Sequence, residues 1–127
     1  MVVDRPGRPP TPPVLLRALV DSGADRTTFP PKIAWKLGIR RNELISHPGG
    51  GRGVKSRFDV WTSSVSIRAE VSRRDVSTGA DSAWGPTFTL WPFFIDGGSF
   101  LLGRADFFSV FTVTFQEGRG RVFHLDT

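Results

Sequence analysis

A single aspartate follows an apolar segment directly and opens a short turn. Asp21 comes after Leu19 and Val20 and is followed by Ser22, Gly23 and Ala24. Burying a charged carboxylate is costly unless it is paired or hydrogen-bonded. Ser22 offers a hydroxyl, Gly23 lets backbone N–H groups approach closely because it has no Cβ, and Ala24 keeps the turn compact. The run can therefore hold a carboxylate in a partly buried, preorganised position, as a catalytic carboxylate requires.

The same tetrapeptide is also compatible with an ordinary turn. Asp, Ser and Gly are all common turn formers. Taken alone, Asp21-Ser22-Gly23 therefore does not separate a catalytic carboxylate from a structural one. The segments around the turn are needed to distinguish these two roles of Asp21.

The pattern of apolar residues around this turn predicts a mainly-β domain. One helix is expected over 32–37, where Pro30-Pro31 suits the first turn and Gly38 the end. Residues 72–86 are polar with two glycines and a proline, which predicts an exposed loop. Gly103 is expected to begin a single helical turn through Phe108. Apolar runs predict strands over 14–20, 54–67, 88–95, 100–102, 110–115 and 120–125.

These elements favour a closed or partly open β-barrel with one or two short helices. The chain has 127 residues, enough for one domain, expected over 14–127. Residues 1–13 are predicted to be a Pro-rich N-terminal arm. No segment approaches the ~20 apolar residues of a membrane helix. The N-terminus also lacks the apolar core of a secretory signal, so we expect a cytoplasmic protein without a membrane partner.

Composition argues against metal sites and gives weak support for nucleic-acid binding. The chain has no Cys and only two His, His47 and His124, so no metal or other cofactor is expected. The net charge is +5, and a basic balance is compatible with a nucleic-acid partner. The arginines are scattered, however, and only Arg40-Arg41 and Arg73-Arg74 are adjacent. A nucleic-acid site is therefore not expected.

Four segments, in this order, resemble the retropepsin-like (retroviral-type) branch of the aspartic proteases. The first contains the Asp-Ser-Gly-Ala run, the second is rich in glycine, the third ends in Gly-Arg, and the fourth is an apolar strand. Each motif is weak alone, but the four in order are specific, and the resemblance spans about residues 14 to 125. The segments are 18–25 with 28–30, 49–53 leading to Ile67, 101–104 with 106–108, and 111–115.

The resemblance implies an aspartic endopeptidase that works as a homodimer on extended peptide substrates. The chain contains one Asp-Ser-Gly motif, so two copies of Asp21 would meet across a two-fold axis. Two such carboxylates share one proton. One acts as general base on a water and the other polarises the peptide carbonyl. Ser22 would bond the partner's backbone, and Gly23 would line the floor of the cleft, with Ala24 supporting the loop.

The resemblance also assigns roles outside the turn. The second signature comprises Leu102, Gly103 and Arg104, and Arg104 is expected to form a structural ion pair with Asp25. Asp106 could compete for Arg104. The glycine-rich segment would be a flap whose backbone bonds the substrate by strand addition. The expected substrate-binding and flap residues are Asp25, Gly49, Gly50, Gly51, Arg52 and Gly53.

Two alternatives stay open. The first is a retropepsin-like dimerisation or peptide-binding module with weak or no catalysis. The intact Asp21-Ser22-Gly23 argues against this alternative. The second is a basic nucleic-acid-binding β-barrel, but the chain lacks the interleaved aromatic and basic residues along one strand that stack on bases.

Overall fold

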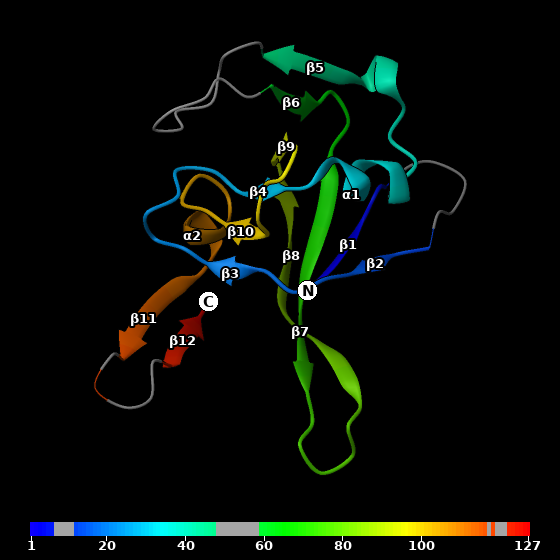
Figure 1. Ribbon diagram of the computed structural model, residues 1–127. Coiled ribbons are helices and arrows are strands. Elements are labelled where there is room, and N and C mark those ends of the chain that lie inside the picture. Colours follow the sequence, from blue (N-terminus) through cyan, green and yellow to red (C-terminus); the bar gives the residue numbers. More distant parts are fainter. Residues whose placement is uncertain (7–11, 48–58, 117, 119–121) are drawn as a thin grey trace.

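Short strands make up most of the regular structure, which confirms the mainly-β prediction (Figure 1). The computed structural model describes residues 1–6, 12–47, 59–116, 118 and 122–127. The helices are α1 (Pro31–Lys36), η1 (Arg41–Glu43) and α2 (Phe107–Val110). The strands are β1 (Val2–Asp4), β2 (Val14–Leu15), β3 (Leu19–Val20), β4 (Thr28–Phe29), β5 (Leu44–His47), β6 (Val60–Ser63), β7 (Ile67–Arg74), β8 (Asp81–Leu90), β9 (Phe93–Ile95), β10 (Leu101–Leu102), β11 (Thr112–Gln116) and β12 (Val122–Asp126).

The strands form three sheets. The first has the order β2-β1-β7-β8, the second β3-β10-β4-β9-β6-β5, and the third contains only β11 and β12. Across the described residues these sheets do not close into a barrel. The mainly-β class is therefore established, whereas the predicted closed barrel is not formed by this part of the chain.

A hydrophobic core joins the two larger sheets and both α-helices. Phe88 comes from the four-stranded sheet, Phe94 from the six-stranded sheet, and Ile33 from α1. Phe107 of α2 is 1% exposed, and its ring centroid lies 6.1 Å from that of Phe88 and 4.9 Å from that of Phe111. Full burial of one such side chain contributes roughly 1.5–3 kcal/mol. This packing fixes α2 against β8 of the four-stranded sheet.

Two apolar runs predicted as single strands are each divided between two sheets. The run 14–20 contributes β2 to the first sheet and β3 to the second. The run 88–95 is interrupted at Trp91-Pro92, after which β9 begins in the other sheet. Proline has no N–H group to donate to a sheet, so the break at Pro92 follows from its chemistry. Nothing comparable in the sequence marks the break between β2 and β3.

The prediction of an exposed loop over 72–86 is wrong. β7 and β8 pair antiparallel as far as Arg74 and Asp81, with a register shift between Ala69 and Val71. Cross-strand pairing therefore overrides the polar, glycine-containing composition of this segment. The result is a long hairpin that projects beyond the core (Figure 1).

Local hydrogen bonds close the tip of this hairpin. Arg74 Nε donates to Asp81 Oδ1 across 3.0 Å. The hydroxyl and amide of Ser77 donate to Asp75, at 2.6 Å and 2.7 Å, and these bonds lower the pKa of that carboxyl group. Gly79 has φ +71°, a conformation that other residues rarely adopt. These bonds and the conformation of Gly79 form the turn that joins β7 to β8.

The first residues of the predicted N-terminal arm belong to a sheet. β1 lies between β2 and β7, so the boundary predicted after residue 13 does not separate the arm from the domain. Residues 7–11 of the arm lie outside the described part of the chain. Arg5 follows β1, and only 4% of its side chain is exposed. The arm is therefore anchored on the core at its start.

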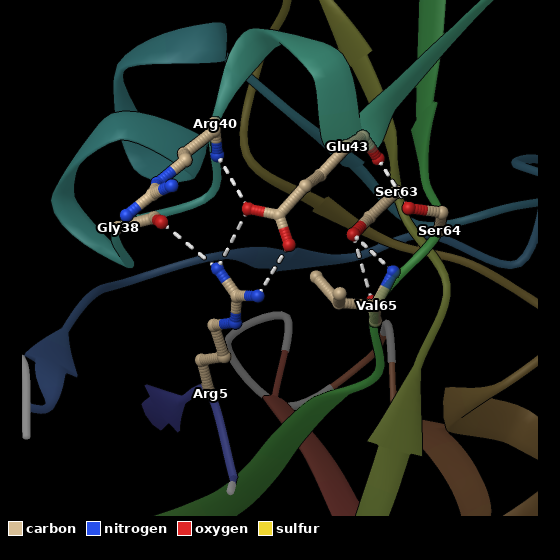
Figure 2. A network of polar contacts seen from close by, with 7 residues as sticks. All are labelled: Arg5, Gly38, Arg40, Glu43, Ser63, Ser64 and Val65. Carbon is tan, nitrogen blue, oxygen red and sulfur yellow. Dashed lines mark hydrogen bonds and ion pairs between the residues drawn. The ribbon is translucent and has the colours of Figure 1, made fainter. Parts of the chain in front are cut away.

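Arg5 joins this strand to the root of another hairpin (Figure 2). Its guanidinium donates to both carboxylate oxygens of Glu43, at 3.1 Å and 2.5 Å, and to Gly38 O at 2.8 Å. The Glu43 carbonyl accepts from the amide and hydroxyl of Ser64, each at 2.8 Å. β5 begins directly after Glu43, and β6 ends just before Ser64. The buried ion pair thus holds both strands of the β5–β6 hairpin.

β5 and β6 pair antiparallel from Leu44↔Ser63 to His47↔Val60. β6 lies within the strand predicted over 54–67, and its pairing with β5 forms a hairpin on either side of the glycine-rich segment. The predicted tip, Gly49 to Gly53, lies outside the described residues.

Within the described part of the chain, no helix is both long and apolar enough to cross a membrane.

Candidate active site

Asp21 lies at the end of β3, where two strands run parallel. β3 pairs with β10 in the register Leu19↔Leu101 and Val20↔Leu102. Leu19 N–H donates to Phe100 O at 2.8 Å, and Asp21 N–H donates to Leu102 O at 3.0 Å. The backbone of Asp21 is therefore fixed by Leu102 of the second signature. Parallel pairing brings these two distant segments side by side.

The turn after β3 holds the Asp21 carboxylate from one side. Gly23 N–H donates to Asp21 Oδ1 at 2.8 Å, and Ala24 N–H donates to Asp21 O at 3.2 Å. A Cβ added to Gly23 would lie 3.2 Å from Asp21 Oδ1, closer than most real contacts of that kind. Asp21 is half-buried, whereas Ser22 and Gly23 are exposed. The carboxylate is thus oriented by one amide and remains open to solvent and to a second molecule.

The second signature packs directly on the loop that follows Asp21. Arg104 N–H donates to Ala24 O, and Ala105 N–H to Asp25 O, both at 2.9 Å. A Cβ on Gly103 would lie only 2.3 Å from the carbonyl carbon of Arg26. Gly103 is therefore required for this close approach of two backbones. Leu102 beside it is 4% exposed and belongs to the core.

The predicted ion pair between Asp25 and Arg104 is not formed in the single chain. Both residues are exposed, and no ion pair between their side chains occurs in the described structure. The two residues are neighbours through their backbones, because the adjoining Arg104 and Ala105 amides bond Ala24 and Asp25. Backbone hydrogen bonds thus hold the two loops together without the ion pair that the resemblance implied.

A buried polar pair that the sequence analysis missed joins the same two loops. Thr27 is fully buried and Asp106 is 8% exposed. The Thr27 hydroxyl donates to Asp106 Oδ1 at 2.5 Å and accepts from Gly103 N–H at 3.2 Å. A usable signal was present, since an Asp directly before an apolar helical turn is a common N-cap. Asp106 is indeed the N-cap of α2 and accepts from Phe107 N–H at 2.9 Å.

Arg26 lies against an aromatic residue on the far side of the loop. Its guanidinium carbon lies 4.5 Å from the centroid of the Phe93 ring, and its Nη2 donates to Trp91 O at 3.3 Å. The Nε of Arg26 is buried without a hydrogen-bond partner in the described structure. A cation over an aromatic face is stabilising by about 0.5–2 kcal/mol. This contact links the loop to the Trp91-Pro92 break between β8 and β9.

The remaining predicted site residues are not part of the described structure. The flap residues Gly49, Gly50, Gly51, Arg52 and Gly53 all lie in the undescribed segment 48–58. Among the residues that are described, no group of three or more His, Asp or Glu side chains could hold a metal ion. The site consists of the Asp21 turn and the Leu102–Asp106 segment packed on it.

Gly103→Ala tests the close approach of the two loops. The added Cβ would collide with the Arg26 backbone, which cannot move aside as a flexible side chain can. We expect the free energy of unfolding to fall by about 3 kcal/mol or more, measured by urea denaturation. Gly118→Ala is the matched control, because its Cβ would meet nothing within 4 Å, and it should change stability by less than about 0.5 kcal/mol. Equal stability of both variants would contradict the geometry.

Comparison of the chain with protein-family models, with characterised proteins and with solved structures finds no significant match. The interpretation of the site therefore depends on its own residues and geometry. The feature that any functional interpretation has to explain is an accessible carboxylate, Asp21, at the start of a loop that packs tightly on a second loop.

Proposed function

We propose that this chain is the subunit of a homodimeric aspartic endopeptidase with a retropepsin-like fold. The observation that carries the proposal is the placement of Asp21. Its backbone is fixed by Leu102, its carboxylate accepts one amide hydrogen bond, and the turn around it is exposed. A carboxylate serving only the fold would be expected to have more of its lone pairs satisfied, as those of Asp106 are.

The proposed reaction needs two copies of Asp21 close together. Two adjacent carboxylates cannot both ionise easily, so they hold one proton between them. The ionised Asp21 takes a proton from a water molecule whose oxygen attacks the peptide carbonyl carbon. The protonated Asp21 donates its proton to the carbonyl oxygen. Transfer of a proton to the amide nitrogen then allows the C–N bond to break, which releases a carboxylic acid and an amine.

The third sheet supports pairing of two chains. In the described structure, β11 and β12 pair only with each other, so their outer edges are unpaired. The hairpin carries Phe115 and Phe123, which are 45% and 43% exposed, with ring centroids 6.3 Å apart. β11 (Thr112–Gln116) contains no charged residue that would discourage edge pairing. We infer that a second copy covers this surface.

Asp21→Asn tests the catalytic role. The substitution keeps the size of the side chain and an acceptor for the Gly23 amide, but it removes the ionisable group. Peptide cleavage should fall by more than about a thousandfold, while the unfolding transition stays close to that of the wild type. Asp96→Asn, at an exposed aspartate after β9, is the control and should retain activity.

The wild-type rate of peptide cleavage should depend on pH along a bell-shaped curve with an optimum below neutrality, because one carboxyl must be ionised and one protonated.

Two outcomes of this assay would count against the protease. Cleavage by Asp21→Asn at the wild-type rate would remove Asp21 from the mechanism. A wild type that dimerises and binds peptides without cleaving them would favour the alternative of a peptide-binding module.

Phe115→Asp tests the proposed pairing surface. A charge at this exposed position of the β11–β12 hairpin should raise the dimer dissociation constant by about tenfold or more. Val76→Asp is the matched control, because Val76 is 99% exposed at the tip of the β7–β8 hairpin. Sedimentation equilibrium measures both constants. A dimer weakened by Val76→Asp and not by Phe115→Asp would move the interface to the β7–β8 hairpin.

A further inference from the structure

We propose that Asp106 is a positioning residue that sets the place of Asp21 through Thr27. The inference rests on the proposed function of Asp21, but the hydrogen bonds that carry it are present in the single chain. Asp106 does not touch Asp21. It acts on the peptide group that holds the backbone of Asp21.

The Asp106 carboxylate is buried and accepts three hydrogen bonds. Oδ1 accepts from the Thr27 hydroxyl at 2.5 Å and from Phe107 N–H at 2.9 Å, and Oδ2 accepts from Trp91 N–H at 3.1 Å. No ion pair compensates its charge in the described part of the chain. The buried charge is therefore compensated by hydrogen bonds from donors at three separate places in the sequence.

The Thr27 hydroxyl has a fixed direction because of Asp106. A carboxylate offers only acceptors, so the hydroxyl must donate to it, which leaves a lone pair of the Thr27 oxygen for another donor. That donor is Gly103 N–H, at 3.2 Å. An amide at position 106 has one acceptor oxygen in place of two, so the Thr27 hydroxyl, Phe107 N–H and Trp91 N–H could no longer all donate to this side chain.

The Gly103 amide connects this pair to Asp21 through a single planar group. The N–H of Gly103 and the C=O of Leu102 belong to one peptide unit. Thr27 holds the N–H of that unit, and the C=O accepts from Asp21 N–H at 3.0 Å. Rotation of the peptide would therefore disturb both bonds together. The position of the Asp21 backbone thus depends on the hydroxyl direction that Asp106 imposes.

The role can be tested with isosteric variants. Asp106→Asn changes the acceptor set, Thr27→Val removes the hydroxyl, and Thr27→Ser restores it. We expect kcat to fall by about a hundredfold in the first two variants with KM changed much less, because a displacement near 1 Å of a catalytic group has effects of this size. Thr27→Ser should stay within about threefold of the wild type. A mere loss of stability would not separate kcat from KM in folded enzyme.

Amide hydrogen exchange supplies a second measurement that does not need activity. In Asp106→Asn, exchange at Asp21 and Gly103 should accelerate by about tenfold or more, while the β7–β8 amides keep their wild-type rates. Asp96→Asn is the control and should change neither region. If the wild type cleaves nothing, the proposed function fails, and hydrogen exchange still decides the inference. Unchanged exchange at Asp21 and Gly103 in folded Asp106→Asn would overturn it, as would an unchanged kcat in an active enzyme.

Discussion

The close contact between Gly103 and the backbone of Arg26 is the constraint on which the rest of the site depends. It allows the loop after β3 and the loop after β10 to pack backbone to backbone, with no side chain between them. The amides of Arg104 and Ala105 then reach the carbonyls of Ala24 and Asp25. Asp21 stands at the start of this double loop. Its carboxylate can be preorganised because the main chain beneath it has little freedom to move.

The pattern of apolar residues predicted much of the fold. The helix expected over 32–37 is α1, the strands expected over 110–115 and 120–125 are β11 and β12, and the short strand expected over 100–102 is β10. The divisions of the runs 14–20 and 88–95 were missed. Apolar residues suit either sheet, and the hydrophobic period of a run does not predict to which sheet each part belongs. The β7–β8 hairpin was missed because cross-strand contacts stabilise a segment whose local composition favours a loop. Local patterns therefore predict elements better than their assignment to sheets.

The candidate site was predicted in part. The sequence indicated Asp21 and Gly23 because a carboxylate next to glycine is an unusual combination after an apolar strand, and Gly103 was indicated by the resemblance to the retropepsin-like proteases. It did not indicate that Asp106, rather than Arg104, would join the two loops through a side chain. Asp106 is buried because segments around Thr27, Trp91 and Phe107 pack around it, and no local sequence motif predicts such packing. The Asp25–Arg104 pair fails in the single chain for the same reason, because close backbone contacts do not require the side chains to meet.

The central claim is that two chains share one active site through their two Asp21 side chains. It is tested most directly by mixing a constant amount of wild type with a ninefold excess of Asp21→Asn and allowing subunits to exchange. Random pairing leaves about one tenth of the wild-type subunits with a wild-type partner, so the initial rate of peptide cleavage should fall to about one tenth. An equal excess of Asp96→Asn should not lower the rate. A rate that is unchanged by Asp21→Asn, in samples whose mass shows mixed dimers, would contradict the shared site.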